Sequence, residues 1–397
     1  MAILHLVQYS LPEIVSGYTL RTQAVVTEQR ALGLDPLVLT SPRHPSSEER
    51  ALEGVPYLRC QPEPKTGVVW LRDARRVRWL AQRVISVARA RGDIALLHAH
   101  SPLLCGVAAL RAGRELGLPV VYEIRGLWEE AMRRHSPRYH LARAMETKLC
   151  RRADAVVAIS QGLREEFVGR GVAEDKVHVV PNGVDLVRFD PETAPRDWRE
   201  RRGFGSEPLL LYLGALRDYE GVDLILEALP RITARHPEAR LIIAGGGEAR
   251  ERIAGAAQAA GEQARLLSPV PHAETPAVYA AADLVLYPRR ATRATERVAP
   301  LKPLEAMAMG RAILASDVGG LRELLTDGET ARLFPAGLAE ALAKIAGELL
   351  DDAPQRERLG AAARAEARGS FGWPRVVSGY LRVYERLGLR VPDDAPA

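Results

Sequence analysis

Residues 284–316, LVLYPRRATRATERVAPLKPLEAMAMGRAILAS, contain the pattern that repeats along the chain. An apolar segment of strand length, Leu284–Tyr287, leads through a polar loop into a helix that begins near Lys302. A second apolar strand, Ala312–Ser316, follows this helix. Apolar strands that alternate with helices are typical of βα units, whose parallel strands form a sheet covered on both faces. This stretch therefore predicts an α/β fold.

The same alternation runs through both halves of the chain. The strand candidates of the first half are Ala2–Val7, Pro36–Thr40, Ile94–His98, Val120–Ile124, Ala155–Ile159 and Val177–Val180. Those of the second half are Leu209–Leu213, Arg240–Ala244, Ala264–Leu267, Leu284–Tyr287, Ala312–Ser316 and Ala331–Phe334. Stretches with helical periodicity separate them. Because 397 residues are typical of two domains with separate cores, we expect two doubly wound domains.

The domain boundaries follow from composition. We expect the first domain to span residues 1–190 and the second to span residues 208–372. Residues 191–207 are charged, contain Pro and Gly and show no apolar face, which is typical of a linker. The amphipathic residues 373–390 predict a final helix, which we expect to cross back to the first domain. Residues 391–397 predict a loose tail.

Composition also narrows the class of protein. The chain is 47% hydrophobic and 26% charged, which is typical of a globular protein with a large core. No apolar run reaches the roughly 20 residues that span a bilayer, and the start MAILHLVQYS lacks the features of a secretory signal. We therefore expect a soluble cytoplasmic protein. Cys60, Cys105 and Cys150 are too far apart for a disulfide framework or a thiolate metal site.

The net charge of +5 is unevenly distributed, because basic residues concentrate between Gly67 and Arg152. Within this stretch, residues 70–91 show an apolar helical stripe with many arginines off it, which predicts an amphipathic basic helix. This helix could simply cover the first sheet, or Trp70, Trp79 and the arginines could contact an anionic membrane peripherally. Since no aromatic stacking motif or recognition module accompanies the basic residues, we expect no nucleic-acid partner.

The loop that follows the strand Leu284–Tyr287 is a candidate site, because such sheets bind ligands beyond the carboxyl ends of their strands. Pro303 suits a first helical turn, and Glu305 is favoured there by the helix dipole, so both residues have purely structural explanations. Alternatively, the Lys302 ammonium and backbone N–H groups of residues 300–305 bind a diphosphate. The Glu305 carboxylate would then accept hydrogen bonds from ribose hydroxyls.

Five segments occur together in a fixed order. They are AVVAISQGLREEF (155–167), VVPNGVDLVRFDP (179–191), LIIAGGGEARERI (241–253), PHAETPAVYAAADLVLYP (271–288) and LKPLEAMAMGRAILASDVGGLREL (301–324). Together they resemble glycosyltransferase family 4, also called group 1, a large family of retaining enzymes of the GT-B type. Within this family, three segments look most like the branch associated with exosortase and exopolysaccharide gene clusters: SLPEIVSGYTLRTQAV (10–25), YEIRGLWEE (122–130) and TRATERVAPLKPLEAMA (292–308).

The resemblance implies a fold and an activity. A GT-B enzyme has two Rossmann-like domains that face each other across a cleft. Family members move a sugar from a nucleotide diphosphate, here UDP or GDP, to an acceptor with retention of anomeric configuration. They generally need no bound metal or other cofactor. The acceptor would be a sugar, a lipid-linked molecule or a small molecule. Two alternatives are a GT-B nucleotide-sugar epimerase and a non-catalytic subunit that binds a nucleotide sugar.

The donor residues follow from the resemblance, with departures. Glu296 precedes Glu305 by nine positions instead of the usual eight, and its counterpart contacts the transferred sugar. Ala215 and Glu220 stand where the family has an Arg and a Lys that grip the diphosphate. A departing diphosphate still needs stabilising charge, so we expect Arg217 to join Lys302 there, with help from Arg289, Arg290 or Arg293. The expected donor-binding residues are Gly17, Arg217, Lys302, Pro303, Leu304 and Glu305.

The first domain departs from the pattern at Arg125, which stands where the family has a His beside the sugar ring. Arginine cannot act as a base near neutral pH. Arg125 could contact the sugar or its phosphate while Glu123 or Glu129 orients the acceptor hydroxyl, or a buried Arg–Glu pair could only fix the loop. Our catalytic candidates are Glu123, Arg125 and Glu296. Further residues expected to line the cleft are Ser16, His100, Trp128, Glu129, His272 and Arg293.

Two histidines at the end of a predicted strand, His98 and His100, raise the question of a metal. We expect the two rings to point to opposite faces of the sheet, as an alternating pair. No further ligands occur at suitable spacing. We therefore predict no metal site.

Overall fold

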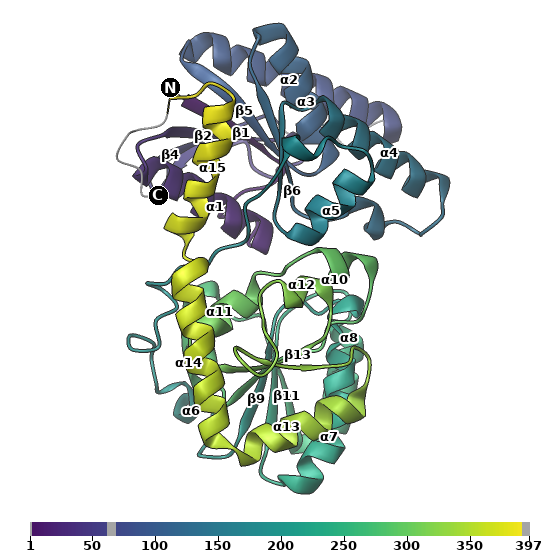
Figure 1. Ribbon diagram of the computed structural model, residues 1–397, viewed down its shortest axis with the longest axis vertical. Coiled ribbons are helices and arrows are strands. Elements are labelled where there is room, and N and C mark those ends of the chain that lie inside the picture. Colours follow the sequence, from purple (N-terminus) through teal and green to yellow (C-terminus); the bar gives the residue numbers. More distant parts are fainter. Residues whose placement is uncertain (1, 62–68, 391–397) are drawn as a thin grey trace. The chain divides into compact units, whose positions relative to one another are not determined.

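The computed structural model of the chain describes residues 2–61 and 69–390. The predicted tail, 391–397, lies outside them. The chain divides into two compact units (Figure 1). Unit 1 consists of Met1–Asn182 and Trp373–Ala397, and unit 2 is Gly183–Gly372.

Unit 1 contains an eight-stranded sheet in the order β3-β4-β2-β1-β5-β6-β7-β8. Neighbouring strands are parallel except β3 and β4. The strands are β1 (Ala2–Val7), β2 (Asp35–Thr40), β3 (Arg50–Leu52), β4 (Val55–Arg59), β5 (Ile94–His100), β6 (Val120–Ile124), β7 (Ala155–Ala158) and β8 (Val177–Val179). The hairpin β3–β4 is absent from our prediction, since it is short and lacks alternation. Its turn has positive φ at Glu53 (51°) and Gly54 (77°), as tight hairpin turns require.

The helices of unit 1 follow the expected alternation. They are α1 (Gly17–Ala31), α2 (Val69–Arg91), α3 (Leu103–Leu116), η1 (Trp128–Ala131), α4 (Pro137–Arg152), α5 (Gln161–Gly169), η2 (Glu174–Lys176) and α15 (Trp373–Arg386). The α15 helix packs beside α1 (Figure 1), and its Tyr384 hydroxyl accepts a hydrogen bond from Gln29 Nε2 at 2.9 Å. The last helix of the chain therefore belongs to the first unit.

Unit 2 contains a six-stranded parallel sheet in the order β11-β10-β9-β12-β13-β14. Its strands are β9 (Leu209–Leu213), β10 (Arg240–Ala244), β11 (Ala264–Leu267), β12 (Leu284–Tyr287), β13 (Ala312–Ser316) and β14 (Arg332–Phe334). Its helices are α6 (Trp198–Arg201), η3 (Asp218–Glu220), α7 (Val222–Arg235), α8 (Arg250–Ala259), η4 (Gly261–Gln263), η5 (His272–Glu274), α9 (Thr275–Ala281), α10 (Arg293–Arg297), α11 (Lys302–Ala308), α12 (Gly319–Arg322), α13 (Ala339–Asp351) and α14 (Ala353–Ser370). The sheet separates two buried apolar clusters, one on each face.

The segment expected to be a linker, residues 191–207, differs from the prediction. It lies within unit 2, whose boundary falls at Asn182–Gly183 rather than near residue 190. Trp198 is 1% exposed, and its ring stacks on Phe204 with centroids 6.0 Å apart. Two aromatic side chains therefore anchor a segment whose charged composition conceals its apolar contacts.

The basic helix α2 packs against α3 through its apolar stripe. Several of its arginines are paired with carboxylates: Arg76 with Asp73 at 2.7 Å, Arg83 with Glu49 at 2.8 Å and Arg89 with Glu115 at 3.0 Å. The side chain of Trp70 lies outside the described part. This arrangement favours the simpler of the two interpretations, a covering helix.

Candidate functional site

The expected pair Lys302 and Glu305 forms the centre of a polar cluster in unit 2. Glu305 is 7% exposed. Its Oε2 accepts hydrogen bonds from Lys302 Nζ at 2.9 Å and from the Tyr279 hydroxyl at 3.1 Å. The Tyr287 hydroxyl donates to the carbonyl oxygen of Lys302 at 2.9 Å. The end of β12, α9 and the first turn of α11 together hold the carboxylate in place.

His272 extends this cluster on the side of β11. Its Nε2 lies 3.9 Å from Glu305 Oε1, and its Nδ1 contacts the Arg188 guanidinium. The Phe189 ring packs edge-on against His272, with centroids 5.9 Å apart. The structure thus brings the expected residue His272 next to Glu305, and it adds Arg188, which the sequence did not single out.

Burial and the neighbouring side chains shift the pKa of Glu305 in opposite directions. Burial raises the pKa, but the Lys302 charge, the nearby His272 ring and the hydrogen bond from Lys302 outweigh burial and lower it below its ordinary value. The carboxylate is therefore ionised at neutral pH. An ionised carboxylate is an acceptor only, with lone pairs suited to ligand hydroxyl groups.

Two glycine-rich turns lie side by side at the ends of β9 and β10. Leu216 N donates to Gly246 O at 2.9 Å. A Cβ added at Gly245 would lie 1.8 Å from Gly214 O, and one at Gly247 would lie 2.3 Å from Leu216 O. Only glycine permits this close approach of two backbones.

Arg217 follows the first of these turns. Its side chain is exposed, and it makes no hydrogen bond or ion pair with the residues that the structure describes. Its charge is therefore available to a ligand, as the hypothesis for the diphosphate requires.

Glu220, which stands where the family has a Lys, is not an isolated negative charge. Its Oε2 lies 3.3 Å from Nε of Arg289, which is 6% exposed. Arg289 Nη1 donates to Val298 O at 3.1 Å, and its Nε has no hydrogen-bond partner of good geometry in the described chain. Arg290 pairs with Asp223 at 2.6 Å. Of the helper arginines we expected, Arg289 thus lies next to position 220, where its charge is paired with that of Glu220.

Glu296 is the second glutamate of the predicted pair. Its Oε2 accepts a hydrogen bond from Gly319 N at 2.8 Å and lies 3.3 Å from Arg322 Nη2. A Cβ at Gly319 would lie 2.2 Å from Glu296 O, so the glycine segment packs directly on α10. In this structure Glu296 holds the start of α12, and its side chain remains 37% exposed.

Two of the predicted donor-binding residues, Pro303 and Leu304, have buried side chains, and their contact with a donor stays a prediction. The Leu304 side chain is fully buried in the core, and its N–H donates to Leu301 O at 3.1 Å. Pro303 is buried as well and has no N–H. The first turn of α11 therefore offers the Lys302 and Glu305 side chains rather than a row of backbone donors.

In unit 1, Glu123 lies at the centre of a second polar cluster with no solvent exposure. It accepts hydrogen bonds from Arg125 Nε at 2.7 Å, from Arg21 Nε at 3.1 Å and from the Tyr380 hydroxyl. Burial raises the pKa of Glu123, but Arg125 and Arg21 lower it well below its ordinary range. Arg125 also donates to Tyr18 O at 2.7 Å. These contacts favour the alternative in which the Arg–Glu pair fixes the loop.

Three histidines lie against this cluster, and two of our expectations about them are wrong. The rings of His98 and His100 stack with centroids 4.4 Å apart at 12°, because residues i and i+2 of a strand point to the same face. Both are fully buried, so His100 does not line an open cleft. The ligand nitrogens of His5, His98 and His100 lie within 4.8 Å of one another. The rings of His98 and His100 are nearly parallel, and His5 Nδ1 lies at hydrogen-bonding distance, 2.9 Å, from His100 Nε2.

The remaining expected residues divide between surface and interior. Glu129 is 1% exposed and pairs with Arg170, so it does not line an open cleft either. Ser16 caps α1 with a reciprocal Ser16–Thr19 capping box, and Gly17 is the first helical residue and is exposed. Trp128 is 40% exposed. Arg293 begins α10.

Comparison with known proteins places the chain in a family. Residues 15–188 match the model of Glycosyltransferase Family 4, and residues 196–366 match that of Glycosyl transferases group 1. The D-inositol 3-phosphate glycosyltransferase 1 of Catenulispora acidiphila is 31% identical over 327 residues, covering 77% of this chain and 76% of that protein. The chain belongs to glycosyltransferase family 4. None of these matches supports the narrower exosortase-associated branch.

Other family 4 relatives align over less of their length. The D-inositol 3-phosphate glycosyltransferase of Xylanimonas cellulosilytica is 33% identical over 62% of this chain and 60% of that protein. The GDP-mannose-dependent alpha-(1-6)-phosphatidylinositol monomannoside mannosyltransferase of Mycolicibacterium smegmatis is 31% identical over 59% of this chain and 62% of that protein. The chain thus matches about three fifths of these two relatives.

Two solved structures confirm the GT-B fold. Sucrose-phosphate synthase from Thermosynechococcus elongatus superposes with a TM-score of 0.80 at 20% identity, over 98% of this chain and 99% of that chain. Anabaena HepE in complex with UDP-glucose superposes with a TM-score of 0.77 at 21% identity, over 98% of this chain and 99% of that chain. Both domains of the GT-B fold are therefore present.

Proposed function

We propose that the protein is a retaining glycosyltransferase that moves a sugar from a UDP or GDP sugar onto an acceptor in glycoconjugate or polysaccharide synthesis. The observation that supports this most directly is the buried, ionised Glu305 beside Lys302. A fixed carboxylate accepts the two ribose hydroxyls of a nucleotide in charge-assisted hydrogen bonds. The adjacent ammonium carries the charge that a diphosphate requires.

The chemistry of the step needs positive charge where the diphosphate leaves. Lys302 Nζ and the exposed Arg217 guanidinium supply it in this proposal, and donors aimed at developing negative charge are the largest single contribution in many enzymes. Arg289 is held by Glu220 and contributes less. Glu296 reaches the transferred sugar only if it releases Gly319 N, so we propose that donor binding rearranges the α10–α12 contact.

Glu123 and Arg125 act as positioning residues in this proposal. Because Glu123 is fully buried, it orients the Arg125 loop rather than touching an acceptor. Gly17 and Ser16 begin α1 at an exposed turn, where a phosphate can approach the backbone. Trp128 is an exposed candidate contact for the acceptor.

The acceptor class is suggested by the relatives' names. Those proteins act on D-inositol 3-phosphate and on a phosphatidylinositol mannoside, so we propose a hydroxyl-rich phosphorylated or lipid-linked acceptor. The proposal does not depend on the exosortase- and exopolysaccharide-associated branch. The three cysteines of the protein are free and buried, which supports action in the cytoplasm.

A screen of ligands tests the proposal and its two rivals. Thermal unfolding with UDP, GDP and their sugars should show a rise in Tm for one nucleotide, because a bound ligand stabilises the folded state. Incubation of that sugar donor with inositol phosphates and simple sugars should then yield a glycoside with retained configuration. An unchanged donor would point to a binding subunit, and a donor epimerised without acceptor would point to an epimerase.

Replacement of the exposed arginine tests the diphosphate contact. We expect Arg217→Ala to lower kcat about 10²-fold, because one charge-assisted donor to the leaving group is lost. Steady-state kinetics with a saturating donor measures this, and Arg358→Ala, which removes an exposed arginine of α14, serves as the control. Turnover of Arg217→Ala within threefold of the unmodified enzyme would show that Arg217 does not contact the diphosphate.

A further inference from the structure

One face of α4 carries an unusual set of exposed side chains. Arg138, Leu141, Met145, Lys148 and Arg152 recur at spacings of three and four residues, so they form one stripe along the helix. Leu141 is 60% exposed and Met145 is 43% exposed. We call these five residues the α4 stripe. Its two large apolar side chains are flanked by cations at both ends.

The exposed surface of α4 has no negative charge to balance these cations. All five basic residues of the helix are exposed. Its only acidic residue, Glu146, is 2% exposed and accepts a hydrogen bond from the Tyr122 hydroxyl at 2.9 Å. Burial raises the pKa of Glu146 to about 7. The helix therefore presents cations and two large apolar side chains to the solvent, and no carboxylate of its own.

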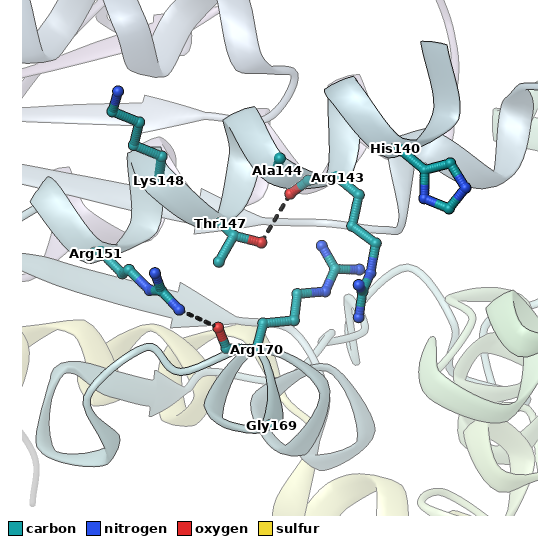
Figure 2. Close-up of a pocket in the computed structure, with 8 residues that line it drawn as sticks. All are labelled: His140, Arg143, Ala144, Thr147, Lys148, Arg151, Gly169 and Arg170. Carbon is teal, nitrogen blue, oxygen red and sulfur yellow. Dashed lines mark hydrogen bonds between the residues drawn. The ribbon is translucent and has the colours of Figure 1, made fainter. Parts of the chain in front are cut away.

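A basic hollow of about 650 Å³ adjoins the stripe, between α4 and α5 (Figure 2). Lys148, Arg143, Arg151 and Arg170 contribute its cations. Arg170 is neutralised by Glu129 and Glu166, and Arg143 lies 3.6 Å from Glu166. Arg151 instead donates to the carbonyl oxygens of Arg170 and Gly171, so its charge is not cancelled by a carboxylate.

A second hollow, of about 950 Å³, lies on the other side of the stripe, toward α3. It is lined by apolar side chains together with Arg111, Arg114, Lys148 and Arg152. Its one carboxylate, Asp154, accepts a hydrogen bond from Val120 N at 2.8 Å. Positive charge thus continues on both sides of Leu141 and Met145.

From this surface we infer that unit 1 docks on an anionic lipid bilayer through the α4 stripe. Leu141 and Met145 enter the headgroup region, while Arg138, Lys148 and Arg152 bind lipid phosphates. Interfacial helices combine buried apolar side chains with cations in this way, and each Lys or Arg near an anionic surface contributes about fivefold to the binding constant.

The stripe fits a bilayer better than it fits nucleic acid. Its centre is occupied by two flexible aliphatic side chains, whereas nucleic-acid sites place aromatic rings or polar groups against bases. It is also a better candidate than α2, whose arginines are largely paired with carboxylates. The inference goes beyond the proposed transfer reaction and needs no part of the donor site.

Vesicle flotation of the full-length protein tests the inference. We expect binding to vesicles of phosphatidylcholine with 30 mol% phosphatidylglycerol at low salt, weaker binding at high salt, and none to phosphatidylcholine alone. Lys148→Gln with Arg152→Gln should weaken binding about 30-fold, and Leu141→Ser with Met145→Ser at least about tenfold. As a matched control, Arg75→Gln with Arg78→Gln on α2 should change binding less than twofold.

The outcomes distinguish the alternatives. Thermal unfolding of each variant and turnover of a soluble acceptor show whether the fold and the donor site are intact. Equal binding by the α4 and α2 variants would overturn the inference, and so would absence of binding to anionic vesicles. Retention of a single-stranded RNA oligonucleotide without vesicle binding would assign the surface to nucleic acid instead. Failure of sugar transfer with intact vesicle binding would count only against the proposed activity.

Discussion

Glu305→Ala is expected to lower donor affinity and kcat/KM by about 10²-fold or more. The substitution removes an ionised acceptor for two ribose hydroxyls, and each hydrogen bond to a charged group contributes about 1.5–3 kcal/mol. It also leaves the Lys302 ammonium without its carboxylate partner at 2.9 Å. Isothermal titration with UDP and GDP, followed by kinetics with the nucleotide sugar that binds, measures both effects.

Two companion variants separate ligand contact from folding. Glu305→Gln keeps the shape of the side chain but not its charge, and we expect it to fold normally while losing most of the affinity. Glu357→Gln neutralises an exposed glutamate of α14 and should leave affinity unchanged. If Glu305→Ala keeps KM and kcat within threefold, the cluster around Glu305 is structural and the proposed donor site is wrong.

Unit 1 is expected to lose stability steeply as the pH falls below about 6.5. Burial lowers the pKa values of His5, His98 and His100, strongly for His5 and His100, so these rings stay neutral when folded. In the unfolded chain they bind protons near their ordinary pKa of about 6.5. The unfolded state therefore gains protons first, and folding free energy is lost from pH 6.5 downwards.

The size of this loss follows from linkage. Each histidine contributes up to about 1.4 kcal/mol per pH unit, so the three together can cost about 3–4 kcal/mol between pH 7 and pH 5.5. That corresponds to a fall of about 10 °C in the Tm of unit 1. The lowered pKa of Glu123 adds a further loss only at lower pH, below its unfolded value near 4.5. Calorimetry across this pH range measures how the Tm changes with pH.

A variant that removes one histidine ring tests the origin of this pH dependence of stability. His5→Asn should reduce the pH dependence by about one third, although it lowers stability at pH 7.5 because Gln29 loses its partner at 2.8 Å. His135→Asn is the control, since His135 is exposed and has a φ of 61°, which asparagine tolerates. A Tm that is independent of pH between 7 and 5.5 would mean that these rings are not buried in solution.

The alternation of strands and helices could be predicted because each buried strand carries its own apolar signal. The expected strands of unit 2 coincide with the observed ones to within one residue. The hairpin β3–β4 escaped prediction, since its pairing depends on a turn with positive φ at Glu53. The boundary between the units could not be predicted either, because the sequence around Trp198 does not show that this side chain packs into the core of unit 2.

Only part of the candidate site could be predicted from the sequence. Lys302 and Glu305 stand out as charges next to an apolar helix start, whereas Tyr279 has the appearance of an ordinary core residue. Its hydroxyl contact with Glu305 becomes clear only when α9 and α11 are brought together. Arg21 was missed for a similar reason, since its partners lie in β6 and α15, more than 100 residues away in sequence.

The return of α15 to unit 1 has a consequence for biosynthesis. A nascent chain that has emerged only as far as residue 182 lacks the hydroxyl groups of Tyr380 and Tyr384, which serve Arg21, Glu123, Gln29 and His98. Unit 2 can complete its own sheet on the ribosome, but unit 1 cannot close its interior until α15 has been synthesised. A chain that stops before α15 therefore leaves buried polar groups of unit 1 without these hydroxyl partners, and proteases can distinguish it from a molecule that contains α15.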